Sequence, residues 1–246
     1  MRKSIAIVTG ASSGMGQEFV RQLDRIAHHI DEIWMIARRK DRLDMLADSI
    51  THCKARCFGI DLCKDEDVER LADLLFTERP DVRILVNAAG VGRAGIFSGI
   101  TGSEAVNMVD VNVRAVVAVT HIVLPFMSQY SRIIQLCSAS AFFPQKEFAV
   151  YAASKSFVLR FSLALQKELR DRCIWVTIVC PGPVDTEFLE IANKGQKPKW
   201  FKKLVTVKPE PVVRKALKDA RDKRLMSIYG LPMKAVYAAS KLLPHI

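Results

Sequence analysis

The chain has 246 residues, 50% of them hydrophobic, which is enough to bury the core of one domain. That composition excludes a disordered chain, and because no run of about 18 apolar residues occurs, we expect no membrane-spanning helix. The net charge of +11 is compatible with nucleic acid, anionic lipid or an acidic substrate. Since most charges are dispersed over helical segments without a recognised binding motif, we expect no nucleic-acid partner.

The N-terminal apolar run 5–8 is too short for a signal peptide and lacks a cleavage site, so we expect a cytoplasmic protein. The cysteines fit that location, because no Cys-x-x-Cys pair occurs among Cys53, Cys57, Cys63, Cys137, Cys173 and Cys180. The first three lie close enough together to suggest a metal site, but no His-x-x-x-His partner is nearby. We interpret all six as buried free thiols and expect no metal.

The predicted elements alternate between strand and helix along the chain. In order, they are a strand at 4–9, a helix at 14–28, a strand at 32–37, a helix at 41–51, a strand at 54–60, a helix at 65–79, a strand at 83–87, a helical region at 101–130, a strand at 132–137, a helix at 150–172, a strand at 174–180, a helix at 209–223, a strand at 225–229 and a tail helix. The strands are continuous apolar runs, which indicates a parallel sheet covered on both faces. This alternation predicts one α/β domain over 1–246, a doubly wound parallel sheet of about seven strands flanked by helices in three αβα layers, with a tail at about 230–246.

A glycine-rich turn, Thr9-Gly10-Ala11-Ser12-Ser13-Gly14-Met15-Gly16, joins the first strand to the first helix. Glycines permit a tight turn there, and they let backbone N–H groups approach a pyrophosphate at the helix N-terminus. A plain turn is the alternative. The strand–turn–helix context favours dinucleotide binding.

The spacing Gly-x-x-x-Gly-x-Gly resembles the short-chain dehydrogenase/reductase family, and further segments match that family in order. Asp61-Leu62 ends the third strand, Asn87-Ala88-Ala89-Gly90 follows the fourth with Ala88 in place of the family's second Asn, and Pro181-Gly182-Pro183-Val184-Asp185-Thr186 follows the sixth. The resemblance covers nearly the whole chain, except about 190–208 and the last twenty residues. It implies a Rossmann-type oxidoreductase that binds its cofactor through Gly10, Ser12, Ser13, Gly14, Met15, Gly16, Asp61, Leu62, Asn87, Ala88, Ala89, Gly90, Tyr151, Lys155, Pro181, Gly182, Val184 and Thr186.

The end of the second strand distinguishes NAD from NADP. An acidic residue there would bind the ribose hydroxyls of NAD, but this chain has Ala37-Arg38-Arg39-Lys40. Arg38 can offer a planar, charged fork to a 2′-phosphate, with Arg39 and Ser12 as helpers. The alternative is a solvated arginine pair opening a helix, which the helix dipole disfavours. We therefore predict NADP(H).

Tyr151 and Lys155 lie one helical turn apart in Tyr151-Ala152-Ala153-Ser154-Lys155. A Lys cation lowers the pKa of a nearby phenol from about 10, which suits acid/base work. The resemblance implies that Tyr151 is the catalytic acid/base and that Lys155 also binds the nicotinamide ribose. It further implies that Ser138, just past the fifth strand, hydrogen-bonds the substrate oxygen and that Asn112 anchors a water in a proton relay.

The same five residues recur as Tyr237-Ala238-Ala239-Ser240-Lys241. Tyr151 has Ser138 upstream and the Pro-Gly-Pro segment downstream, whereas Tyr237 has neither. We expect Tyr237 to be non-catalytic, with Tyr237 and Leu242 packing a tail helix against the body or a neighbouring subunit.

The substrate-binding residues are predicted to be Ser138, Ser140, Gln145, Tyr151 and Phe188. The resemblance implies a lid at about 186–208, which here mixes bulky apolar groups with Lys194, Lys197, Lys199, Lys202, Lys203 and Lys208. With Phe142, Phe143 and Phe148 nearby, this suggests a bulky hydrophobic carbonyl or alcohol with an anionic end, such as a hydroxysteroid, a bile acid or a 3-oxoacyl thioester. Alternatively, the lysines are solvated and the aromatic residues belong to the core.

A non-catalytic NADP(H)-binding sensor or scaffold of the same fold remains the alternative function. The set Asn112, Ser138, Tyr151 and Lys155 favours an enzyme, because a sensor does not need all four. The resemblance also implies a homo-oligomer, a dimer or tetramer, formed through the helices that hold Asn112 and Tyr151.

Overall fold

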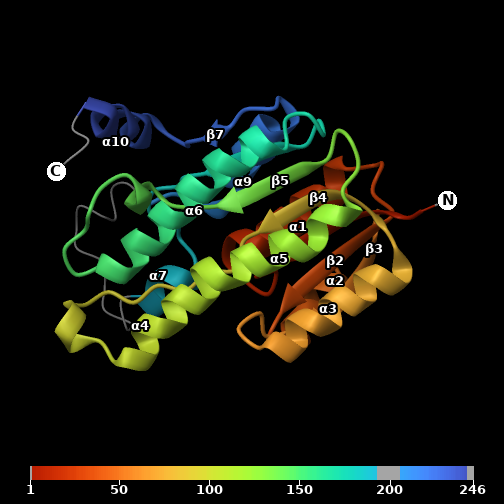
Figure 1. Ribbon diagram of the computed structural model, residues 1–246, viewed down its shortest axis with the longest axis horizontal. Coiled ribbons are helices and arrows are strands. Elements are labelled where there is room, and N and C mark those ends of the chain that lie inside the picture. The colour runs from red at the N-terminus through yellow and green to blue at the C-terminus, as the bar shows by residue number, and fades with distance from the viewer. Residues whose placement is uncertain (1, 193–205, 243–246) are drawn as a thin grey trace.

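The computed structural model describes residues 2–192 and 206–242, shown as a ribbon in Figure 1. Within these residues, strands form one sheet in the order β3-β2-β1-β4-β5-β6-β7, and all neighbours are parallel. The strands are β1 (Ser4–Thr9), β2 (Glu32–Ala37), β3 (Lys54–Gly59), β4 (Asp81–Asn87), β5 (Arg132–Leu136), β6 (Trp175–Val179) and β7 (Met226–Ser227). The predicted doubly wound sheet is confirmed, because the strand order changes direction between β1 and β4.

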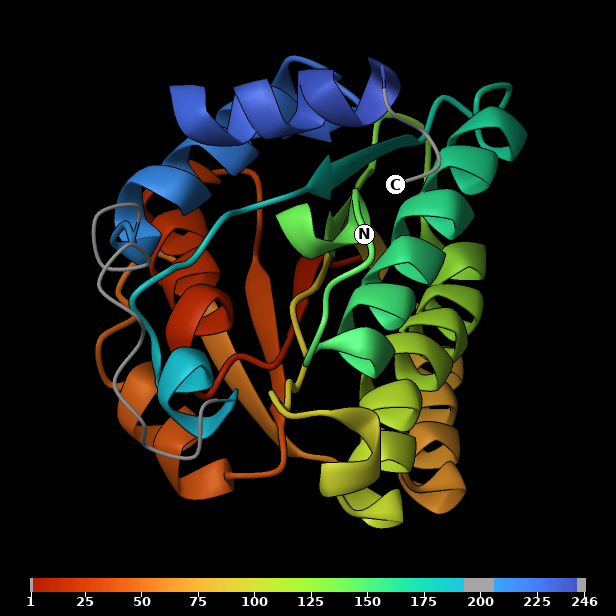
Figure 2. The same ribbon diagram turned by 90° about the vertical axis from the view of Figure 1, so that its left-hand side faces the viewer.

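Helices cover both faces of this sheet and make the three predicted layers (Figure 2). They are α1 (Gly14–Ile26), α2 (Lys40–Ala47), α3 (Asp65–Glu78), α4 (Gly102–Val109), α5 (Ala115–Val123), α6 (Ala149–Glu168), α7 (Glu187–Ala192), α9 (Pro209–Arg221) and α10 (Leu231–Leu242). One face carries α1, α2 and α9, and the other carries α3, α5 and α6. Helix α10 lies across one end of the molecule, beside the 3-10 turn Ala139–Ala141.

The continuous apolar strands are explained by two separate hydrophobic cores. In β1, Ile5 and Ile7 pack into the core under α3, α5 and α6, whereas Ala6 and Val8 pack into the core under α1, α2 and α9. Successive side chains of a strand point to opposite faces, so the middle of a strand covered on both sides favours apolar residues at every position. Every residue of β2 is buried for the same reason.

Several elements end earlier than the sequence indicated. The helix predicted at 41–51 stops at Ala47, and the helix predicted at 150–172 stops at Glu168. After α6 the chain turns through Cys173, whose φ of 53° is left-handed, so the helix cannot continue into β6. The last strand contains only Met226 and Ser227, and it pairs with the end of β6.

The predicted helical region at 101–130 ends at Phe126. It consists of α4, a π-helical turn, α5 and the 3-10 turn Leu124–Phe126. A capping box of Thr101 and Glu104 starts α4, and a π-helical turn, Asp110–Arg114, separates α4 from α5. By length and composition, Gly102–Phe126 meets the criteria of a membrane span, as core helices of soluble proteins also do; its most apolar window has a mean hydropathy of 1.5. In this fold α4 packs against α6, and α5 packs against β4 and α3.

All six cysteines are free, but the expectation that all are buried holds for only three. Cys53, Cys137 and Cys180 are buried, whereas Cys57, Cys63 and Cys173 are half-buried. In the part of the chain that the structure describes, no three His, Cys, Asp or Glu side chains are grouped to hold a metal ion.

The turn between β1 and α1 is packed too closely for side chains at two glycines. Gly10 has a left-handed φ of 65°, and a Cβ there would lie 2.7 Å from the backbone of Ala89. A Cβ on Gly16 would overlap the carbonyl oxygen of Gly10. From the other side, the hydroxyl of Thr9 accepts hydrogen bonds from the N–H groups of Ala88 and Ala89, both at 3.1 Å. The turns after β1 and β4 are therefore held directly against each other.

This packing predicts a large difference between two glycine-to-alanine substitutions. We expect Gly16→Ala to lower the free energy of unfolding by about 1–3 kcal/mol, because the added methyl group forces the turn apart. The matched control is Gly102→Ala, since a Cβ on Gly102 meets nothing within 4 Å. Denaturant unfolding of both variants checks this, and an equal effect in the two would contradict the packing argument.

Candidate active site

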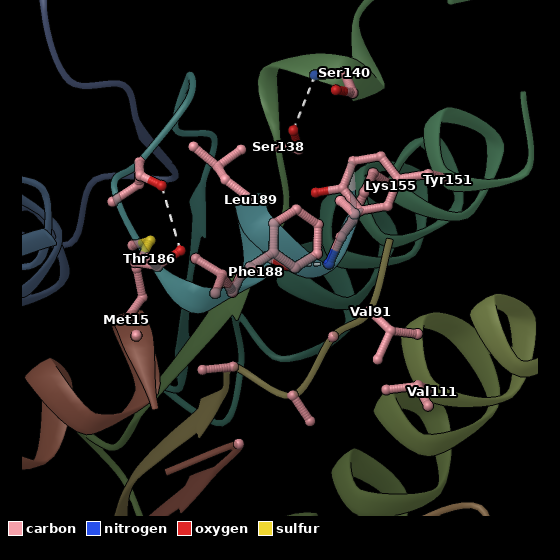
Figure 3. A pocket seen from close by; sticks show the side chains of 18 of the residues that line it. Met15, Val91, Val111, Ser138, Ser140, Tyr151, Lys155, Thr186, Phe188 and Leu189 are labelled. Atoms are coloured by element: carbon pink, nitrogen blue, oxygen red, sulfur yellow. Dashed lines mark hydrogen bonds between the residues drawn. The ribbon is translucent and has the colours of Figure 1, made fainter. Parts of the chain in front are cut away.

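A cavity of about 1030 Å³ opens at the carboxyl ends of the parallel strands (Figure 3). The segments that follow β1 to β6 all contribute to its lining, together with α7 and α10. This is the position expected for a ligand in a doubly wound sheet, where the loops at the strand-order switch leave a crevice. The site is therefore built from residues that lie far apart in the sequence.

At one end of the cavity, the glycine turn presents the N-terminus of α1. Ser13 is the N-cap residue, and its side chain makes no capping hydrogen bond to the helix. The first turn of α1 carries no acidic residue. Free backbone N–H groups and the helix dipole favour an anionic group at this position.

The two arginines after β2 behave differently. Arg38 is exposed and lines the cavity. Among residues 2–192 and 206–242, its side chain has no hydrogen-bond or ion-pair partner. Arg39 donates to the hydroxyls of Ser12 at 3.3 Å and Ser13 at 3.0 Å. It also forms a two-pronged ion pair with Glu187, at 2.7 and 3.1 Å.

Tyr151, Lys155 and Ser138 face the same part of the cavity (Figure 3). Both Tyr151 and Lys155 are buried on α6, and the Lys155 Nζ lies 5.8 Å from the Tyr151 ring centre. Lys155 Nζ donates to the carbonyl oxygen of Leu136 at 2.9 Å, which fixes the ammonium beside the end of β5. The Ser138 Oγ accepts a hydrogen bond from the N–H of Ser140 at 3.1 Å.

Burial dominates the protonation of both groups on α6. It raises the pKa of Tyr151 well above the ordinary value, and a hydrogen bond with Ser138 only partly opposes this effect. The expectation that Lys155 lowers the pKa of Tyr151 is therefore not met in this structure. Burial also lowers the pKa of Lys155, because a charged ammonium loses its hydration.

Asn112 lies in the π-helical turn behind the cavity and is fully buried. Its amide accepts from the N–H of Val91 and donates to the Val91 carbonyl oxygen, both at 2.9 Å. The same amide donates to the Ser154 hydroxyl at 3.0 Å, next to Lys155 on α6. A Cβ on Gly90 would lie 3.3 Å from the Asn112 Oδ1 and 3.4 Å from the Lys155 Nζ, so the two groups are neighbours.

The cavity brings together nearly all of the predicted site residues. Those that line it are Gly10, Ser12, Ser13, Gly14, Met15, Gly16, Arg38, Arg39, Asp61, Leu62, Ala88, Ala89, Gly90, Ser138, Ser140, Gln145, Tyr151, Lys155, Pro181, Gly182, Val184, Thr186 and Phe188. Asn87 and Asn112 are outside this set. Asn87 is buried, and its amide donates to the hydroxyl of Thr120 at 3.0 Å, away from the cavity.

The lid prediction is only partly inside the described chain. Helix α7 begins directly after Thr186, and its Phe188 and Leu189 line the cavity. Lys208 is the N-cap residue of α9. The remaining lysines of the predicted cluster lie outside the described residues: Lys194, Lys197, Lys199, Lys202 and Lys203.

The tail helix also lines the cavity, a contribution that was not predicted from the sequence. Met233 and Val236 of α10 line the cavity, and a Cβ on Gly182 would lie 2.7 Å from the Met233 sulfur. The sequence signal was the spacing of these two residues on one face of the predicted helix.

The second Tyr-x-x-x-Lys motif lies on α10 and repeats one local hydrogen bond of the first, although its lysine lies closer to the ring, at 4.7 Å. Ser240 Oγ donates to the carbonyl oxygen of Tyr237 at 2.8 Å, just as Ser154 Oγ donates to that of Tyr151 at 2.7 Å. The Tyr237 ring packs against Phe142 at 5.0 Å between ring centres, which agrees with the predicted structural role. Leu242 is 81% exposed and does not pack against the body, so for this residue only the predicted packing against a neighbouring subunit stays open.

Comparison with known proteins identifies the family. Residues 4–197 match the short chain dehydrogenase family model. An uncharacterised oxidoreductase of Staphylococcus haemolyticus is 32% identical over 197 residues, which cover 79% of this chain and 84% of that protein. A very-long-chain 3-oxoacyl-CoA reductase of Neurospora crassa is 31% identical over 222 residues, which cover 86% of this chain and 63% of that protein.

Solved structures have the same fold. A short-chain dehydrogenase from Sphingobium yanoikuyae in complex with NADPH has a TM-score of 0.82 and 25% identity, covering 99% of this chain and 96% of the other. A short chain dehydrogenase/reductase from Burkholderia phymatum in complex with NAD has a TM-score of 0.82 and 19% identity, covering 98% and 92%. The chain thus belongs to the short-chain dehydrogenase/reductase family of oxidoreductases.

Proposed function

We propose that this protein interconverts a ketone or aldehyde and an alcohol by NADP(H)-dependent hydride transfer, on a bulky hydrophobic substrate. One observation carries the proposal: Ser138, Tyr151 and Lys155 face a cavity that also contains the glycine turn and the arginines after β2. A non-catalytic sensor would need only the cofactor half of this cavity.

The residues present fit an NADP(H) molecule. The N-terminus of α1 would receive the pyrophosphate, and Arg38 and Arg39 would receive the 2′-phosphate together with the hydroxyls of Ser12 and Ser13. At the end of β2, Ala37 offers no carboxylate to the ribose hydroxyls that NAD exposes. The bound nicotinamide ring supplies or accepts the hydride, and the protein orients it. The NADPH complex of the Sphingobium relative supports this choice.

Three side chains would handle the proton and the substrate oxygen. Because its pKa is raised, Tyr151 is a neutral phenol at physiological pH, the form that donates a proton to a carbonyl oxygen. The Ser138 Oγ accepts from Ser140 and is hydrogen-bonded to the Tyr151 phenol, so a substrate oxygen that enters between the two side chains would take over the Ser138 proton. Lys155, held by the Leu136 carbonyl, would bind the nicotinamide ribose and so keep the cofactor beside Tyr151.

Asn112 would act through the elements that it connects. Its amide ties the segment at Val91 to Ser154, and thereby keeps the chain after β4 in register with α6. A water beside its Oδ1 would extend the proton path from Lys155. We therefore assign Asn112 a positioning role in the reaction, with its side chain outside the substrate space.

The lining supports a bulky apolar substrate. Two aromatic side chains pack against the Tyr151 ring, with ring centres 4.4 Å away for Phe148 and 5.5 Å away for Phe188. The further apolar lining residues are Phe143, Leu189, Met233 and Val236. Hydroxysteroids, bile acids and 3-oxoacyl thioesters fit such a lining, and the Neurospora relative is itself named for a 3-oxoacyl-CoA substrate.

A spectrophotometric assay with NADPH or NADH tests this proposal. We expect NADPH-dependent reduction of steroid ketones, bile-acid ketones or 3-oxoacyl thioesters, and weak activity on small polyols and sugars. A strong preference for small neutral sugars would refute the substrate class. Tight NADPH binding without turnover of any carbonyl would instead identify a sensor.

In the same assay Tyr151→Phe should lower kcat by about 10²–10⁴-fold, while the matched control Tyr237→Phe keeps most activity.

The raised pKa of Tyr151 predicts different pH dependences for reduction and for oxidation. Reduction needs the protonated phenol, which persists through neutral and moderately alkaline pH, so its kcat/KM should be flat between about pH 6 and 9. Oxidation needs the phenolate, so its kcat/KM should rise about tenfold per pH unit in this range. An oxidation rate that levels off near neutral pH would show that the phenol ionises there.

We also propose that the chain forms a homo-oligomer through the outer faces of α4, α5 and α6. Those faces expose Val106, Val109, Val117 and Phe157, an apolar set that is typical of a protein interface. Light scattering should give the mass of a dimer or tetramer, and Phe157→Glu should shift it toward a monomer. A monomeric wild-type protein would contradict this proposal. The cytoplasmic location stays a prediction from the sequence.

A further inference from the structure

Glu187, the first residue of α7, forms ion pairs with Arg39 and Arg42, which lie after β2. Its two carboxylate oxygens accept from Arg39 at 2.7 and 3.1 Å, and one of them also accepts from Arg42 at 2.8 Å. Arg42 lies on α2, and Arg39 directly precedes that helix. Glu187 thus ties the start of the lid to the segment that follows β2.

The carboxylate uses the donors that a 2′-phosphate requires. Arg39 Nη2, which donates to Glu187, also donates to the hydroxyls of Ser12 and Ser13 on the glycine turn. The two arginines lower the pKa of Glu187 to about 2, so the side chain is an anion at any physiological pH. An arginine fork that holds one carboxylate in both prongs cannot hold a phosphate in the same prongs.

We propose that Glu187 is a specificity-determining residue whose carboxylate competes with the cofactor's 2′-phosphate for Arg39. Binding of NADP(H) therefore displaces Glu187, whereas binding of NAD(H) leaves the Arg39–Glu187 pair in place. Arg38, which is exposed and lines the same cavity, would bind the phosphate together with Arg39 once Glu187 has left. The inference rests on the proposed preference for NADP(H) and adds a cost that the chain's own lid imposes on it.

Displacement of Glu187 would also affect the side chain that packs against Tyr151. Phe188, the next residue of α7, packs with its ring centre 5.5 Å from that of Tyr151. The same ring lies so close to Gly92 that a Cβ there would come within 2.6 Å of it. Because Glu187 and Phe188 are adjacent, releasing the carboxylate removes the restraint at the start of the helix that positions Phe188. The presence of a 2′-phosphate is thereby coupled to the substrate side of the cavity.

Calorimetry with two nucleotide fragments measures the competition without any turnover. The probes are adenosine 2′,5′-bisphosphate and adenosine 5′-phosphate, which differ only in the 2′-phosphate. The full-length variant Glu187→Gln should bind the bisphosphate about three- to tenfold more tightly than the wild type, a gain expected for removing a partly exposed competing ion pair. Its affinity for the monophosphate should stay within about twofold.

Glu190→Gln is the matched control, because Glu190 is an exposed carboxylate on the same helix and is absent from the hydrogen bonds of Arg39 and Arg42. It should leave both affinities unchanged, which separates the local contact from the general charge of α7. An affinity of Glu187→Gln for the bisphosphate that is unchanged, or weaker, would overturn the inference. An equal gain in Glu190→Gln would overturn it as well.

Hydrogen exchange in α7 reports the release of Glu187 directly. In the wild type, the bisphosphate should speed amide exchange in 187–192, and the monophosphate should not; no change with either probe would overturn the release. The wild-type affinities test the proposed function separately. A wild type that binds both probes equally contradicts the NADP(H) preference itself, whereas a wild type that prefers the bisphosphate upholds that preference even where the variants overturn the role of Glu187.

Discussion

The site depends on one geometric constraint, the close approach of the turns after β1 and β4. Both strands run in the same direction, so both turns leave the sheet at one edge, where the chain order reverses. The Thr9 hydroxyl and the missing side chain of Gly10 hold these turns in contact. Every other part of the cavity is placed relative to that contact, including the segment at Gly90 that adjoins Lys155 and Asn112.

The sheet was predictable because its chemistry is local and repetitive. Ile5 to Val8 are apolar without interruption, and only a strand covered on both faces requires that pattern. The glycine turn and the Tyr-x-x-x-Lys pair were predictable for a similar reason, since each acts within one turn of chain. Helix ends were less predictable, because the left-handed residue Cys173 that follows α6 has no distinct signature in the sequence.

What the sequence could not show is produced by contacts between distant segments. The pKa of Tyr151 rises because the phenol is buried, with the rings of Phe148 and Phe188 packed against it, although the local i, i+4 Lys155 suggested a lower pKa. Asn112 turns toward Val91 because a π-helical turn re-aims it. The identical motif at Tyr237 shows the same limit: one local hydrogen bond matches that at Tyr151, but the surroundings differ.

Helix α10 gives this architecture a division between a fixed frame and an adjustable surface. Its Met233 and Val236 border the cavity, and Met233 also packs against the core, whereas the strands and α6 carry the groups that handle the proton. Substitutions in a peripheral helix of this kind change the shape that a ligand must fit while the proton-handling groups keep their positions. Such a chain can acquire new ligand preferences over evolutionary time through its last helix, while Ser138, Tyr151 and Lys155 stay where β5 and α6 hold them.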